Sequence, residues 1–231
     1  MKNLSKESVD LKRLDKDKYA GLYYGQSGED TILWRLFKSK PKGFYVDVGA
    51  HHPRKFSNTY LLHRYRNWTG VNIDATQESI DAFVAERPND INICSAVSKT
   101  RGQVQLRLTS GGARNTISDQ RAQSVVDHGI EIREERSVSS EPLADLLARV
   151  LVANQRIDLM NVDVEGMDLE VLQSNDWDRF RPGVIVIEDL DFRSQNGRTP
   201  ISDFMTGQGF ALLSHLYDTS IYNDAKDRKT A

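Results

Sequence analysis

The chain has 231 residues, enough for one α/β domain with a sizeable core. Hydrophobic residues make up 39% and charged residues 28%, and the net charge of −2 gives no electrostatic reason to expect nucleic acid or an anionic membrane as a partner. The sequence has no secretory signal and no apolar run near the roughly 20 residues of a membrane span, so we expect a cytoplasmic protein.

Residues 1–20 form a polar N-terminal extension rich in Lys and Asp, and residues 21–231 are predicted to form a single domain. The first helix is expected to begin at Ser27, whose hydroxyl can cap it. Strands and helices then alternate, with strands predicted over 44–48, 70–74, 91–97 and 104–108 and helices over 57–66 and 78–87. The single cysteine, Cys94, falls in an apolar run and is expected in the core.

Residues 110 to about 137 interrupt the alternation, because few apolar side chains occur there. A polar insertion of this length predicts a lid or a substrate-binding loop, and otherwise a disordered loop. The pattern resumes with helices over 141–153, 168–174 and 200–207 and strands over 157–164, 184–188, 210–214 and 220–222. This order predicts an α/β fold with a doubly wound sheet and an antiparallel edge hairpin.

The last part of the chain carries apolar side chains at Phe210, Leu212, Leu213 and Leu216. They are expected to pack in the core. The alternative is that they form the contact surface of a homo-oligomer.

The first predicted strand carries Asp47 and breaks at Gly49, and the second strand ends on Asp74. A strand, a glycine turn and an acid closing the next strand can hold a nucleoside, because the glycine admits the ligand and the acid accepts both ribose hydroxyls. Dinucleotide enzymes place three glycines at this turn, whereas in this chain His51 and His52 follow a single one. S-adenosylmethionine, which has a ribose and no phosphate, fits this pattern better than a dinucleotide.

Acidic side chains also end the later strands, and ligands of open α/β sheets bind at this edge. The acids are Asp47, Asp74, Asp163, Glu165, Glu188 and Asp189. Because unpaired buried carboxylates are costly, such clustering indicates ligand hydroxyls, ammonium groups or a cation, unless the acids are solvated. The period of two in an extended strand places Asn161, Asp163 and Glu165 on one face.

Asp163 and Glu165 are therefore the first candidates to accept the proton of a hydroxyl acceptor. The same pair can hold a divalent metal, but two carboxylates are sparse support and the sequence assigns no metal ligands. No His or Cys spacing of the structural zinc type occurs. His52 and His51 are further candidates for the general base, with a packing role in the turn as the alternative.

Several segments recur together in one known family: YGQSGED (24–30), GFYVDVGAHHP (43–53), SNT (57–59), WTGVNIDA (68–75), AVS (96–98), DLMNVDVEG (158–166) and VIVIE (184–188). Through them the chain resembles the FkbM family of S-adenosylmethionine-dependent methyltransferases. The resemblance implies a class I methyltransferase (Rossmann-like) fold with a seven-stranded sheet whose last strand is antiparallel. It also implies methyl transfer to a small-molecule or carbohydrate acceptor, usually a hydroxyl of a sugar, polysaccharide or natural-product precursor.

The resemblance assigns roles residue by residue: Asp47 and Gly49 to the cofactor turn, Asp74 to the ribose, Gln26, Glu29 and Asn58 to the methionine end, and Asp163 and Glu165 to the acceptor side. This chain departs from the family pattern at two places. Many members have a lysine where Asn161 stands, and a small or amide residue and a further glycine where His51, His52 and Pro53 follow Ala50. Both departures fall near the expected acceptor, so they bear on the acceptor and the base.

Two other classes of function share parts of this pattern. A nicotinamide-dependent enzyme acting on a sugar nucleotide would use Asp74 similarly, but it needs the second and third glycines and a catalytic Tyr-x-x-x-Lys pair. A non-catalytic protein that binds S-adenosylmethionine as a partner of another enzyme is the second alternative. Methylation of nitrogen or of a protein side chain is also compatible with the sequence.

Overall fold

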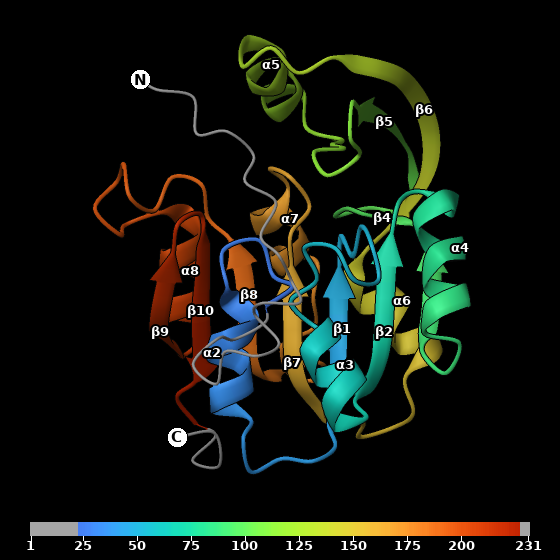
Figure 1. Cartoon of the computed structure of the whole chain (residues 1–231). Coiled ribbons are helices and arrows are strands. Elements are labelled where there is room, and N and C mark those ends of the chain that lie inside the picture. Colours follow the sequence, from blue (N-terminus) through green and yellow to red (C-terminus); the bar gives the residue numbers. More distant parts are fainter. Residues whose placement is uncertain (1–22, 227–231) are drawn as a thin grey trace, which may run out of the picture.

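The computed structural model describes residues 23–226, so the predicted extension over 1–20 lies outside the described residues. A seven-stranded sheet in the order β3-β2-β1-β7-β8-β10-β9 forms its centre (Figure 1). The strands are β1 (Phe44–Val48), β2 (Thr69–Asp74), β3 (Ile91–Cys94), β7 (Ile157–Val162), β8 (Pro182–Glu188), β9 (Phe210–Leu216) and β10 (Thr219–Asp224). The strands β3, β2, β1, β7 and β8 pair in parallel, whereas β10 is antiparallel to both β8 and β9. The predicted doubly wound sheet and its antiparallel last strand are confirmed.

Helices cover both faces of this sheet. The helices α2 (Glu29–Leu36) and α3 (Tyr60–Arg66) lie on one face, and α6 (Leu143–Val150), α7 (Asp168–Gln173) and α8 (Pro200–Gly207) lie on the other, while α4 (Gln77–Glu86) follows β2. Successive residues of a strand point to opposite faces. In β1, Tyr45 accordingly joins the core under α2 and α3, and Val46 joins the core under α6 and α7.

A second sheet in the order β4-β6-β5 lies beyond the carboxyl ends of β1 and β2 (Figure 1). It consists of β4 (Ala96–Val97), β5 (Gly102–Thr109) and β6 (Ile132–Glu141), and α5 (Asp119–Asp127) connects β5 to β6. The predicted single strand over 91–97 is two strands, because the chain leaves the main sheet at Ser95. The insertion over 110–137 contains α5 and the first half of β6, so much of it is regular structure.

The start of α2 differs from the prediction that Ser27 caps it. The N-cap residue is Gly28, which has φ +89° and makes no side-chain cap. The backbone N–H of Ser27 instead donates to Oε2 of Glu29 at 2.9 Å. The acid in the first turn of the helix therefore fixes the residue before the N-cap, and no side chain caps the helix.

Three predicted core residues are exposed because they lie on the edge strands of the main sheet. Leu212 and Leu213 on β9 are 46% and 44% exposed, and Cys94 ends the opposite edge strand, β3, in an exposed position. Phe210 is buried as predicted. An apolar run indicates that a strand exists, but it does not show whether the strand lies at the centre or at the edge of the sheet, where its side chains are less covered.

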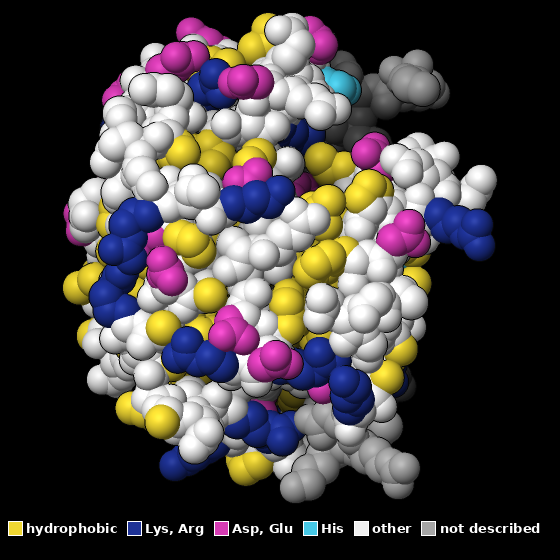
Figure 2. Space-filling view, turned by 180° about the vertical axis from the view of Figure 1, so that it is seen from behind, with side chains coloured by type: hydrophobic (Ala, Val, Ile, Leu, Met, Phe, Trp, Pro, Cys, Tyr) yellow, Lys and Arg dark blue, Asp and Glu magenta, His cyan; other side chains and the backbone are white. Residues whose placement is uncertain are grey.

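Charged side chains of both signs are interspersed on the face seen in Figure 2. Some of the charged side chains of the molecule form small networks, such as Glu141 with Arg101 and Arg149. On the described part of that face we find no continuous basic surface of the kind that follows a phosphate backbone. No helix within residues 23–226 is long and apolar enough to cross a membrane.

Candidate functional site

The carboxyl ends of the parallel strands meet at one edge of the main sheet, where the chain turns after β1 through Gly49. Gly49 has φ +76°, and a Cβ atom there would lie 1.8 Å from the backbone oxygen of Asp163. The sequence predicts a glycine that admits a ligand. In the structure this glycine is needed for a contact inside the protein, because it lets the ends of β1 and β7 approach each other.

A cavity of about 70 Å³ opens beside Gly49. Its apolar side chains come from both sheets and from the insertion: Ile73, Ala96, Val97, Leu106 and Ile117. Asp74, Asp163 and Glu165 supply its acidic groups. We call this space the first cavity.

Asp74, the predicted ribose ligand, lies at the end of β2 and is held by several hydrogen bonds. Its Oδ2 atom accepts the backbone N–H of His51 at 2.9 Å, and its Oδ1 atom accepts the N–H and the hydroxyl of Thr76 at 2.9 and 2.7 Å. Each carboxylate oxygen offers two acceptor positions. Oδ2 therefore retains one position for a ligand, while the backbone fixes the orientation of the group.

A second cavity of about 30 Å³ adjoins the first and shares Gly49, His51, Ala113 and Asp163 with it. Its other polar lining residues are Gln26, Asp47, Ser57, Asn58 and Asn161. The structure thus brings together most of the predicted site residues around two adjoining spaces. Both spaces lie at the carboxyl ends of β1 and β7.

A buried chain of hydrogen bonds connects the residues of the second cavity. Asn58 Nδ2 donates to Asn161 Oδ1, and Asn161 Nδ2 donates to Asp47 Oδ1, both at 2.9 Å. The Thr59 hydroxyl donates to Asp47 Oδ2 at 2.9 Å, so both oxygens of this carboxylate have a donor. Burial raises the pKa of Asp47, while the nearby Arg87 and these donors act against that rise. The buried Oδ1 of Asn58 has no partner among the described residues and is available to a donor in the cavity.

Arg87, which the sequence analysis missed, lies fully buried at the end of α4. One terminal nitrogen donates to Tyr45 Oη and Thr59 Oγ1, at 3.0 and 2.8 Å. The other donates to Ser57 Oγ at 2.9 Å and to the backbone oxygen of Pro53. Arg87 therefore holds the segment that carries Asn58 into the second cavity. An arginine at a helix end is usually solvated, so the sequence contains no signal for this role.

Two predicted residues do not line either cavity. Glu29 is buried at the start of α2, with its carboxylate bonded to the Ser27 N–H. The Nδ1 atom of His52 accepts the backbone N–H groups of Arg54 and Lys55, both at 3.0 Å, so this ring closes the turn. His51 lines both cavities, and burial lowers its pKa from the ordinary histidine value.

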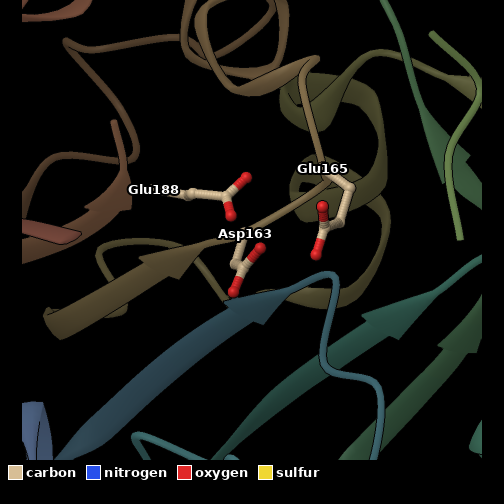
Figure 3. Close-up of side chains that lie close together, drawn as sticks. All are labelled: Asp163, Glu165 and Glu188. Atoms are coloured by element: carbon tan, nitrogen blue, oxygen red, sulfur yellow. The ribbon is translucent and has the colours of Figure 1, made fainter. Parts of the chain in front are cut away.

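Three carboxyl groups converge at the ends of β7 and β8 (Figure 3). One oxygen from each of Asp163, Glu165 and Glu188 lies within 4.8 Å of the others. We call these residues the carboxylate cluster. Glu165 has φ +55°, so the extended backbone has already ended and the predicted shared face with Asn161 does not reach it. The Glu165 side chain lines the first cavity, whereas Asn161 lines the second.

The electrostatics of the carboxylate cluster follow from burial and from like charges. Burial and then the neighbouring Glu165 raise the pKa of Asp163 well above its usual range, and burial and then Asp163 do the same for Glu188. Burial also raises the pKa of Glu165, which Arg121 counteracts by donating from Nε at 2.8 Å and from Nη2 at 2.5 Å. Close by, burial raises the pKa of Asp168 to about 7, although the N–H groups of Val164 and Gly166 bond to it.

A wide cleft with both polar and apolar walls lies on the other side of the cluster, between α5 and the segment that follows β8. Its lining includes Ser118, Gln120, Arg121, Ser124, His128, Asp168, Glu188, Asp189, Asp191 and Thr199. Residues 112–117 line the first cavity and residues 118–128 line the cleft, so one inserted segment borders both. The Thr116 hydroxyl attaches this segment to the main domain by donating to the backbone oxygen of Glu165 at 2.7 Å.

Replacing Asp163 with asparagine is expected to stabilise the protein at neutral pH relative to the wild type. The folded pKa of Asp163 is raised, so its contribution to stability is fully present below the unfolded pKa of about 3.9 and is lost as the pH rises through the folded value. Asparagine loses no proton, so the difference in unfolding free energy should grow above about pH 4. Urea unfolding of both proteins between acidic and neutral pH, with a chelator present, measures it. A difference that does not change with pH would contradict the raised pKa.

The chain does contain one Tyr-x-x-x-Lys spacing, at Tyr222 and Lys226. Tyr222 is buried in β10, and Lys226 follows the end of that strand. Because β10 runs antiparallel, its end lies at the opposite edge of the sheet from the two cavities. This pair therefore cannot serve a ligand bound near Asp74.

Comparison with known proteins gives one family. The FkbM methyltransferase domain matches residues 47–215, and no curated protein matches the chain. Among solved structures, an O-methyltransferase from Bacillus cereus in complex with SAH matches at 10% identity and a TM-score of 0.46, covering 92% of this chain and 86% of that one. A precorrin-6y C5,15-methyltransferase from Geobacter metallireducens GS-15 matches at 10% identity and a TM-score of 0.43, covering 90% and 93%. These two likenesses are too distant to carry any statement about ligands.

The sheet order, with antiparallel β10 between β8 and β9, and the glycine turn and acid that follow β1 and end β2 define a class I methyltransferase fold. The sequence match extends over most of this domain. The chain belongs to the FkbM methyltransferase family.

Proposed function

We propose that the protein is an S-adenosylmethionine-dependent methyltransferase that methylates a hydroxyl oxygen of a sugar, a polysaccharide or a natural-product precursor. Family membership supports methyl transfer. The observation that carries the finer proposal is the position of the carboxylate cluster, whose members line the two cavities on one side and the cleft on the other. A hydroxyl in the cleft would meet proton acceptors at the point nearest to the cavities.

The residues of the two cavities fit the parts of this cofactor. The apolar side chains of the first cavity suit an adenine ring, and Asp74 presents a free acceptor position to ribose hydroxyls. In the second cavity, the unpartnered Oδ1 of Asn58 and the side chain of Gln26 suit the ammonium and carboxylate of a methionine group. When bound, S-adenosylmethionine supplies an electrophilic methyl group on a sulfonium.

The carboxylate cluster would orient the acceptor and remove its proton. Asp163 lines both cavities and has a raised pKa, so it would take up a hydroxyl proton more readily than an exposed aspartate. Glu165 is held by Arg121 and would act mainly by position. His51, kept neutral by burial, is the other base within the lining. A positioned base contributes about 10²- to 10⁴-fold to such a reaction.

The composition of the cleft supports an acceptor with many hydroxyl groups. Its walls offer hydroxyls, an amide, a guanidinium and a carboxylate from Ser124, Thr199, Gln120, Arg121 and Asp191, beside apolar surface from Leu169, Leu190 and Ile201. A desolvated hydroxyl that finds no partner costs about 1 to 3 kcal/mol, so a polyol is best accommodated by a polar wall. The mixed wall suits a carbohydrate, whose ring carries both hydroxyl groups and C–H faces.

Asp74→Asn is expected to weaken binding of S-adenosylhomocysteine by about tenfold or more, because a charge-assisted hydrogen bond to the ribose is lost. Isothermal titration calorimetry of the wild type and the variant measures the change. Asn keeps an acceptor for Thr76, so the variant is expected to fold. Asp81→Asn, an exposed acid on α4, is the matched control and should bind like the wild type.

Absence of binding to a folded wild type would overturn the cofactor assignment and reopen the nicotinamide alternative. Binding without methyl transfer to any of a panel of hydroxylated acceptors would favour the non-catalytic alternative. Release of S-adenosylhomocysteine that depends on an amine or a protein acceptor would replace O-methylation with the other chemistry.

A further inference from the structure

We propose that Asp163, Glu165 and Glu188 bind one divalent metal ion of the Mg²⁺ or Mn²⁺ type. The ion would lie between the cavities proposed for the cofactor and the cleft proposed for the acceptor. Its role in positioning an acceptor rests on the proposed function. Its existence rests only on the geometry and charge of the three side chains.

The three side chains have the ligand chemistry and the convergence that such an ion requires. They come from the end of β7, from the turn after it and from the end of β8, and their carboxyl groups point toward one another (Figure 3). Their nearest oxygens lie within 4.8 Å of one another, so each can reach a common point between them. Mg²⁺ and Mn²⁺ prefer oxygen ligands and usually retain other positions for water or substrate.

Glu188 provides an observation beyond the clustering itself. Its side chain is only partly exposed, and its Oε2 atom, which is buried, has no hydrogen-bond partner among the described residues. Leaving a buried acceptor unpaired is costly, and more so for a charged one. The group is directed toward Asp163 and Glu165, which repel it when all three carboxyl groups are ionised (Figure 3). An unpartnered acceptor in this position indicates a cationic occupant.

The uncompensated charge of the cluster is opposite in sign and equal in size to that of a divalent cation. The three carboxylates carry three negative charges when ionised, and the paired cation is Arg121, which directs two nitrogens to the same oxygen of Glu165. Two negative charges are left uncompensated at the cluster. Asp168 and Asp47, which also face Asp163, are satisfied by N–H and hydroxyl donors but add further negative potential.

The site is placed where an ion could contact an acceptor. Asp163 and Glu165 line the first cavity, and Glu188 lines the cleft, so open coordination positions would face the space between them. A divalent ion there would hold an acceptor hydroxyl and lower the pKa of that hydroxyl. A second oxygen of Asp163 would still be free to accept the proton.

The test is titration of chelator-treated protein with MnCl₂, followed by loss of the free Mn²⁺ signal in electron paramagnetic resonance. We expect one site in the wild type and a loss of affinity of about tenfold or more in Glu188→Gln, since even an outer partner of a ligand contributes about 10- to 100-fold. Asp191→Asn removes an exposed carboxylate from the same cleft and is expected to bind Mn²⁺ like the wild type. The thermal unfolding midpoint, measured with and without Mn²⁺, is a second readout.

Mn²⁺ should raise the unfolding midpoint of the wild type and of Asp191→Asn but not that of Glu188→Gln. No binding at millimolar Mn²⁺ would overturn the proposal, as would equal binding by Glu188→Gln, which would indicate an unrelated surface site. Titration of S-adenosylhomocysteine into the same samples separates this result from the proposed function. Cofactor binding without Mn²⁺ binding would overturn the metal site alone, and Mn²⁺ binding without cofactor binding would overturn the proposed function alone.

Discussion

Replacing Gly49 with alanine is expected to lower the free energy of unfolding by about 2 to 4 kcal/mol, since backbone strain and overpacking each cost about 1 to 3 kcal/mol. The added Cβ would lie 1.8 Å from the backbone oxygen of Asp163, and φ is +76°. Neither the strand end nor the turn can move alone, because Asp163 N–H also bonds to the backbone oxygen of Val48 at 3.0 Å. Chemical denaturation measures stability, and titration of S-adenosylhomocysteine measures the effect on the cavities.

Gly129→Ala is the matched control for the backbone conformation. Gly129 has φ +78°, but an added Cβ there meets nothing within 4 Å. Its substitution should cost about 1 kcal/mol of backbone strain. Equal losses in the two variants would mean that the contact with Asp163 relaxes freely, and the close approach of β1 and β7 would then not require a glycine at position 49.

The sequence correctly predicts the glycine turn at Gly49, but it gives only part of the reason why a glycine is needed there. The glycine turn and Asp74 can be recognised from sequence, because their spacing is set by the geometry of a strand, a helix and the next strand. The contact between Gly49 and Asp163 joins residues more than a hundred positions apart in the chain. No local pattern encodes such a contact.

The fold is predictable wherever periodicity is continuous, and the errors fall where the chain leaves a regular element. Strand β7 is recognisable from its apolar run, but the positive φ of Glu165 turns that side chain away from the expected face. Residues 91–97 resemble one strand because the passage at Ser95 between two sheets leaves the apolar pattern intact. Glu188 is recognisable as a strand-end acid, yet its meeting with Asp163 depends on the sheet order.

The two adjacent histidines show the same limit within the site. His51 and His52 are equivalent in sequence, and both are candidates for the base. The positive φ of His51 directs its ring to the cavities, while His52 turns back to accept two backbone N–H groups. The choice between them is made by one backbone conformation, which sequence patterns do not specify.

Arg87→Met is expected to destabilise the protein by about 3 to 5 kcal/mol, because several buried acceptors lose their donor at about 1 to 3 kcal/mol each. The arginine is 0% exposed and serves four acceptors, among them Thr59 and Ser57 on the segment that enters the second cavity. Its charge also opposes the rise in the pKa of Asp47. Methionine fills a similar volume but leaves these acceptors unpaired.

The same variant should bind S-adenosylhomocysteine more weakly even under conditions where it remains folded, because Asn58 would lose its fixed position. Arg54→Met is the control, since Arg54 lies on the neighbouring surface and pairs with Glu86 in an exposed salt bridge. Little change is expected there, because exposed ion pairs are screened by solvent. If Arg87→Met kept both the stability and the ligand affinity of the wild type, the segment at 53–59 would have to be held by its own packing. A loss of stability with unchanged affinity would separate the two roles and leave Arg87 as a core residue only.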